Sequence, residues 1–185
     1  FWKNLNSKNT GLNLQIFNPT KEQNGRGSTH TVIELVQDDM PYLVDTLIMA
    51  MNRLGINVHF VLYSGKMRLL YNSSGKVIDI LPLFSNYMED EVHRALIYVE
   101  IDQQINTSKE IKDLAKEIEL VMQDVLLTVS DFLPMKSKMK SVLNGLERIK
   151  CKSKIQKKFN ESLSFLQWIL DDHFIFLGYN YFKIN

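Results

Sequence analysis

Apolar and polar residues alternate at several places in the first hundred residues, and this alternation predicts β-strands. Residues 32–36, 57–63 and 95–101 carry apolar side chains at alternate positions, which is the period of a strand. A shorter strand is expected over 12–17. Two further strands that form a hairpin-like excursion are expected over 67–71 and 77–81. The turn signals are the Ser-Gly pairs at 64–65, before the first strand, and at 74–75, between the two.

The spacing of apolar residues changes to three and four further along, which predicts amphipathic helices. The first helix is expected from Pro41 to Leu54, ended by Gly55, since a glycine commonly follows the last helical turn. The second is expected over 108–132, with Ser108 as its N-terminal cap. Two more helices are expected over 135–149 and 155–170.

The order strand, helix, strand, excursion, strand, helix defines the predicted fold class. This βαββα order is most of a ferredoxin-like α+β unit, whose antiparallel sheet carries its helices on one face. We therefore predict such a domain over 30–132, preceded by a strand and polar loop over 1–29 and followed by a helical connector over 133–170. The closing residues 171–185 are predicted as a strand. It either completes this sheet or begins the next module, and we favour the second because two helices intervene.

The composition is that of an ordinary globular protein, with 45% hydrophobic and 23% charged residues in 185. A net charge of +1 gives no overall attraction for nucleic acid or an acidic membrane. No apolar run approaches the roughly 20 residues of a membrane-spanning helix. The single cysteine, Cys151, excludes an internal disulfide and fits the reducing cytoplasm. The start at Phe1 has neither an initiator Met nor a signal core, so we expect the chain to continue upstream.

One segment departs from this charge balance. Between Lys136 and Lys158 there are nine basic residues and one acid, Glu147. We favour lysines on the solvated side of helices, or facing an acidic surface of a longer chain. The alternative is a ferredoxin-like nucleic-acid-binding module that uses this segment for phosphate contacts. Phe159 is the only aromatic within reach for stacking on bases, which disfavours the alternative.

The junction between the first strand and the first helix, Asp38-Asp39-Met40-Pro41, has two interpretations. Asp39 caps the helix by accepting a bond from the Tyr42 amide, and Pro41 lies in the first turn, where its missing N–H costs little. Alternatively, the free amides of the helix start hold a ligand carboxylate. Because Asp38 and Asp39 repel anions, a zwitterion with an ammonium group fits better than an anion.

Three stretches of the sequence, taken together, are similar to a known family. HTVIELVQDDMPYLVDTLIMAMNRLG, YVEIDQQ and DDHFIFLGYNYF, in this order, resemble the N-terminal region of the large bacterial NAD-specific glutamate dehydrogenases. The resemblance spans about Thr31 to Phe182. It implies an ACT-like domain over 30–132, a type of βαββαβ unit that often binds amino acids and self-associates. The catalytic, NAD-binding domain would lie far downstream.

The resemblance implies a non-catalytic regulatory and assembly module. The parent enzyme would oxidise L-glutamate to 2-oxoglutarate and ammonium with NAD. The implied partners are the downstream domains of the same chain, further copies of the module and a small amino-acid effector. No cofactor is expected in this fragment itself.

The resemblance also selects an effector-binding turn. The turn is similar to the acidic-x-Pro-Gly-Leu turn of ligand-binding ACT domains, and its candidate residues are Asp38, Asp39, Met40, Pro41, Tyr42 and Leu43. Tyr42 stands where those domains place glycine. A tyrosine there either occludes the approach of a ligand to the backbone or lines a different pocket.

A second candidate site is a contact face on the sheet. If the strands are ordered as in a ferredoxin-like sheet, one face collects the side chains of Glu34, His59, Tyr98 and Glu100. Carboxylates near His59 would raise its pKa and make contacts through this face pH-sensitive. The alternative is a half-solvated sheet face without a partner.

We identify no catalytic residues and no metal ligands in the sequence. Gly25-Arg26-Gly27 precedes its strand and lacks the third glycine of a dinucleotide-binding loop. The histidines and Cys151 are scattered singly, and Asp171-Asp172-His173 is interpreted as a helix end turning into a strand.

Overall fold

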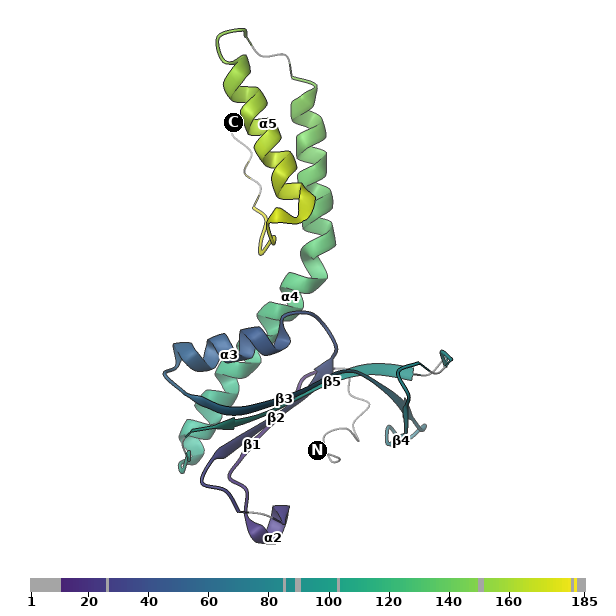
Figure 1. Ribbon diagram of the computed structural model, residues 1–185, viewed down its shortest axis with the longest axis vertical. Coiled ribbons are helices and arrows are strands. Elements are labelled where there is room, and N and C mark those ends of the chain that lie inside the picture. The colour runs from purple at the N-terminus through teal and green to yellow at the C-terminus, as the bar shows by residue number, and fades with distance from the viewer. Residues whose placement is uncertain are drawn as a thin grey trace. The chain divides into compact units, whose positions relative to one another are not determined.

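The computed structural model describes residues 11–25, 27–84, 86–88, 91–102, 104–149, 152–180 and 182. The chain divides into two compact units, residues 1–125 and 126–185 (Figure 1). In the described part, no helix is long and apolar enough to cross a membrane.

The first unit is built on a five-stranded antiparallel sheet with the order β1-β2-β5-β3-β4. Its strands are β1 (Asn13–Phe17), β2 (Thr31–Asp38), β3 (Val58–Tyr71), β4 (Val77–Leu81) and β5 (Glu91–Ile101). The two predicted strand segments over 57–63 and 67–71 are joined into β3 through an irregular register between Ser64 and Met67. A one-turn helix, α2 (Lys21–Asn24), lies in the β1–β2 connection.

Two helices cover one face of this sheet, as predicted. They are α3 (Leu43–Arg53), seen above the strands in Figure 1, and the first part of α4 (Ser108–Glu147). Gln37 of β2 reaches Met122 of α4, with 3.8 Å between Nε2 and Sδ. The α+β ACT-like fold class is therefore confirmed.

The fourth-strand position of the ferredoxin-like order, next to β2, is filled by β1. Residues 13–17 pair with residues 32–36 in antiparallel register. The strand predicted at the C-terminus does not form in the described residues: η1 (Ile169–His173) is a π-helical turn, and residues 175–180 have no regular structure. The connection from β1 to β2 is short, so its closure costs less chain entropy than recruiting a strand from beyond two helices.

The helix starts differ from the predictions in two places. α3 begins at Leu43, two residues after the predicted Pro41. The cap of α4 is Thr107 rather than Ser108: Thr107 Oγ1 accepts a bond from the Glu110 amide at 3.2 Å and donates to the Glu110 carboxylate at 2.6 Å. Thr107 thus acts as an N-cap residue whose hydroxyl satisfies an otherwise unpaired amide of the first turn. Gly55 has a φ of 70° and follows α3 as expected.

A single helix stands where two were predicted over 108–132 and 135–149. α4 continues through Pro134 to Glu147. A proline removes one N–H donor from a helix, and the helical periodicity on both sides of Pro134 outweighs that loss. The second unit contains the rest of α4 from 126 and α5 (Gln156–Trp168), which matches the helix predicted over 155–170.

The hydrophobic core lies between the sheet and the helices, and β2 is buried on both faces. Every residue from Thr31 to Gln37 is buried. On the face turned away from the helices, a buried cluster joins strands β2, β3 and β5 and contains Val36, Leu69, Tyr71 and Leu96. The alternation expected for a half-solvated sheet therefore does not describe β2.

Candidate functional site

The turn from β2 to α3 has an unusual backbone at Tyr42. Tyr42 has φ 71° and ψ 6°, which is the left-handed region, and its carbonyl accepts the first helical bond from the Thr46 amide at 3.0 Å. An L-residue with a side chain is strained there by about 1–2 kcal/mol, whereas glycine is not. The position thus has the backbone conformation that favours the glycine of the acidic-x-Pro-Gly-Leu turn, although it carries a tyrosine.

The predicted cap by Asp39 is wrong. α3 has no side-chain cap, and Asp39 Oδ1 instead accepts a hydrogen bond of 2.9 Å from the Tyr63 hydroxyl of β3. The left-handed Tyr42 moves the helix start to Leu43, so Asp39 and Pro41 both precede the helix. The prediction that Pro41 lies in the first helical turn is wrong for the same reason.

Asp38 is held by a buried arginine. Asp38 and Arg94 are cross-strand partners on β2 and β5, with 2.7 Å between Oδ1 and Nη1. The Arg94 side chain is 1% exposed, whereas that of Asp38 is 52% exposed. The carboxylate therefore compensates a buried positive charge and still faces solvent.

Tyr63 approaches Asp39 because Gly65 leaves room for it. A Cβ atom at Gly65 would lie 2.3 Å from the Tyr63 hydroxyl oxygen. Burial first, and then the hydrogen bond and the charge of Asp39, raise the pKa of Tyr63 above its ordinary value. The irregular part of β3 and the β2–α3 turn thus form one connected structure.

The structure brings three of the four sheet-face candidates together. Glu34 and Tyr98 are cross-strand partners, and the Tyr98 hydroxyl donates to Glu100 Oε1 at 2.5 Å. Glu34 and Tyr98 are 5% and 7% exposed, which rules out a half-solvated face at these two positions. His59 lies at a register shift, and its ring stacks on His30 with 4.4 Å between centroids.

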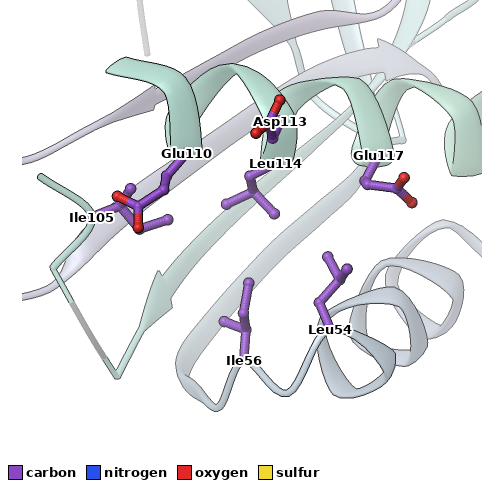
Figure 2. A pocket seen from close by; sticks show the side chains of 7 residues that line it. All are labelled: Leu54, Ile56, Ile105, Glu110, Asp113, Leu114 and Glu117. Atoms are coloured by element: carbon purple, nitrogen blue, oxygen red, sulfur yellow. The ribbon is translucent and has the colours of Figure 1, made fainter. Parts of the chain in front are cut away.

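A cavity that the sequence analysis missed lies between the end of α3 and the start of α4. It measures about 290 Å³ and combines an apolar floor with carboxylates on α4 (Figure 2). The lining residues are Leu54, Ile56, Ile105, Leu114, Glu110, Asp113 and Glu117. Acidic residues at intervals of three and four on α4 were the only sequence signal for it.

The loop that carries Ile105 into this cavity is fixed by a buried hydrogen-bond network. Thr31 Oγ1 accepts from the Ile105 amide at 2.8 Å and donates to Asn18 Oδ1 at 2.6 Å. Asn18 Nδ2 donates in turn to the Ile105 carbonyl at 2.8 Å.

The described residues contain no group of three or more His, Cys, Asp or Glu side chains placed to hold a metal ion. Asp171-Asp172-His173 is the end of the turn η1 (Ile169–His173), where His173 Nδ1 donates to the Trp168 carbonyl at 3.0 Å and Asp172 pairs with Lys136. Cys151 lies outside the described residues.

The strand order, with two helices on one face and β1 in the fourth-strand position, defines an ACT-like α+β domain. A protein-family model described as glutamate dehydrogenase, ACT1 domain, matches residues 1–118. The chain belongs to this family, which confirms the resemblance found in the sequence.

Two curated relatives extend the similarity into the second unit. The chain is 36% identical over 171 residues to a NAD-specific glutamate dehydrogenase of Pseudomonas aeruginosa, covering 92% of this chain. It is 32% identical over 179 residues to a NAD-specific glutamate dehydrogenase of Halomonas elongata, covering 93% of this chain. The chain spans only about 10% of the length of either relative.

The nucleic-acid-binding alternative finds no support in these comparisons. In the basic segment, Lys138 and Lys140 are exposed on α4, whereas Met135 and Leu143 are buried. This pattern agrees with lysines on the solvated side of a helix.

Proposed function

We propose that this chain is a non-catalytic regulatory and assembly module of a NAD-dependent glutamate dehydrogenase. The parent enzyme would convert L-glutamate to 2-oxoglutarate and ammonium in the cytoplasm, with NAD bound in downstream domains of the same polypeptide. The observation that carries this proposal is the match to the glutamate dehydrogenase ACT1 domain, supported by relatives about ten times longer that are named NAD-specific glutamate dehydrogenases.

A small amino acid would act as effector at the β2–α3 turn. The left-handed backbone of Tyr42 and the absence of a side-chain cap on α3, in this described segment, leave first-turn amides available for the ligand carboxylate. The carboxylates of Asp38 and Asp39 would attract the ligand ammonium. The hydrogen bonds from Tyr63 to Asp39 and from Arg94 to Asp38 fix the two carboxylates in position for this role.

Thermal unfolding of the full-length dehydrogenase with a panel of L-amino acids tests the effector site. We expect at least one amino acid to raise the melting temperature, because a ligand of the native state stabilises it. Asp39→Asn should weaken that ligand about tenfold, since one charge pair is lost. Asp124→Asn, which removes an exposed carboxylate on α4 outside this turn, is the matched control and should bind normally. If no amino acid shifts the unfolding, the effector role is wrong.

Self-association would use the outer edge of β3. β4 pairs with β3 only from Arg68 to Tyr71, so the described sheet offers no neighbour to the outer edge of β3 before Arg68. Phe60, Leu62 and Tyr63 in this part of β3 are each about half exposed. Edge strands with apolar side chains pair readily with another copy of themselves.

The oligomeric mass of the full-length enzyme tests this edge. Leu62→Lys should lower the mass, because it places a charge in the new pairing. Met49→Lys on α3, 70% exposed in the native chain, should leave the mass unchanged. An unchanged mass for both variants would rule out assembly through β3.

A further inference from the structure

We propose that the described residues 82–84 and 86–88, which follow β4, belong to a pre-ordered docking loop that inserts into an apolar pocket of the downstream part of the dehydrogenase. The pocket has a basic rim. This inference rests on the proposed function in one respect, namely that the module works within a much longer chain.

The loop exposes large apolar side chains to solvent. Phe84 is 101% exposed, Tyr87 74%, Leu83 61% and Met88 45%. β4 adds Ile78 at 63%. Single exposed apolar residues are ordinary on a protein surface, but four large ones within one short stretch of chain, two of them aromatic, are typical of a protein interface.

A buried ion pair between β3 and β5 donates and accepts hydrogen bonds that fix the backbone of the loop. Arg68 and Glu91 have side chains 7% and 2% exposed, with 2.5 Å between Nη2 and Oε2. Arg68 also donates to the carbonyls of Pro82 at 2.7 Å and Asn86 at 2.9 Å. The Met88 amide donates to Glu91 at 3.2 Å.

These contacts hold the loop at both ends while its apolar side chains stay in solvent. Burying a charge pair costs desolvation free energy, which hydrogen bonds to the pair partly offset. Here those bonds go to the backbone of the loop. A loop ordered before binding loses less conformational entropy when a partner captures it. The geometry is therefore that of a preorganised binding loop.

The charge of this region indicates the character of the partner. The sequence from 77 to 93 contains Asp79, Glu89, Asp90 and Glu91 and no lysine or arginine. With Arg68 set against Glu91, the formal charge of this stretch of sequence is −3. A partner with basic residues around an apolar pocket complements this composition.

The downstream chain is the occupant we select. The match covers about 10% of each relative, so roughly nine tenths of those chains lie outside it. We therefore assign the docking loop to a surface of that remaining part of the chain.

Photo-crosslinking in the full-length dehydrogenase tests the proposal. We place p-benzoylphenylalanine at position 84, and at position 49 on α3 as an exposed control. Mass spectrometry of the crosslinked peptides should join position 84 to one downstream segment rich in apolar and basic residues. Position 49 should not join that segment.

The alternative results are equally definite. Crosslinks from position 84 to residues 1–185 of another copy, or to solvent-exposed segments without preference, would overturn the docking role. A Phe84→Ser, Tyr87→Ser variant should reduce protection of the same downstream segment from hydrogen exchange, and Met49→Ser should not. An enzyme that fails to respond to amino acids but gives the expected crosslink would contradict the effector role alone.

Discussion

The hydroxyl of Tyr63 on β3 donates a 2.9 Å hydrogen bond to Asp39, which lies in the turn between β2 and α3. This bond fixes the position of a carboxylate that we expected to cap the helix. It also makes the turn dependent on an irregular stretch of β3, about 24 residues later in the chain. A substitution at Tyr63 should therefore alter the turn at Asp39, and a substitution at Asp39 should alter the environment of Tyr63.

Titration of Tyr63 should destabilise the module at high pH. Its pKa is raised in the folded chain, so the folded state retains the phenolic proton more tightly than the unfolded state does. The stabilisation is complete below the unfolded pKa near 10 and is lost as the pH rises through the higher folded value. Melting temperatures from pH 9 to 11.5 should fall more steeply for the native chain than for Tyr63→Phe. Equal slopes would show that this bond is not formed.

Gly65→Ala should displace the Tyr63 ring. The new Cβ would lie 2.3 Å from the phenolic oxygen, and the exposed end of the tyrosine gives way more easily than the strand. The ultraviolet titration of Tyr63 should then return towards its ordinary pKa, and Asp39 should lose its partner. Gly11→Ala, where no atom lies within 4 Å, is the control and should change neither property.

The Arg68–Glu91 pair should determine acid stability. Arg68 first, with further bonds from His93 and the Met88 amide, lowers the pKa of Glu91 to about 2. The stabilisation is therefore present above the unfolded pKa of about 4.5 and is lost as the pH falls towards 2. In thermal unfolding from pH 6 to pH 2.5, Glu91→Gln should lower the melting temperature most at pH 6. The difference from the native chain should shrink on acidification; a constant difference would argue against this linkage.

Tyr42→Gly should stabilise the module, by up to about 1 kcal/mol. Glycine removes the strain of the left-handed backbone, and its larger freedom in the unfolded chain offsets part of that gain. Tyr42→Ala retains a Cβ and the strain, so it should bring little or no gain. Urea unfolding of the three chains measures both differences. If alanine stabilises as much as glycine, the tyrosine ring rather than the backbone is the source of the strain.

The sequence alone determined the elements whose signals are local. The alternation over 32–36 and 95–101 predicted β2 and the second half of β5, and Gly55 marked the end of α3. Side-chain periodicity and glycine conformation depend on only a few neighbouring residues, so both can be read from the sequence without the tertiary structure. The three family-like stretches likewise indicated the ACT-like N-terminal region of the glutamate dehydrogenases, which the ACT1 match confirms.

Only the tertiary structure decided which distant groups meet. It assigned the fourth-strand position to β1, paired Asp39 with Tyr63 instead of the α3 amides, and stacked His59 on His30. The first depends on which segment pairs with the free edge of β2, and the other two involve residues at or beside register shifts in β3. Such pairings join residues far apart in the chain, and their free energy comes from contacts that no local pattern encodes.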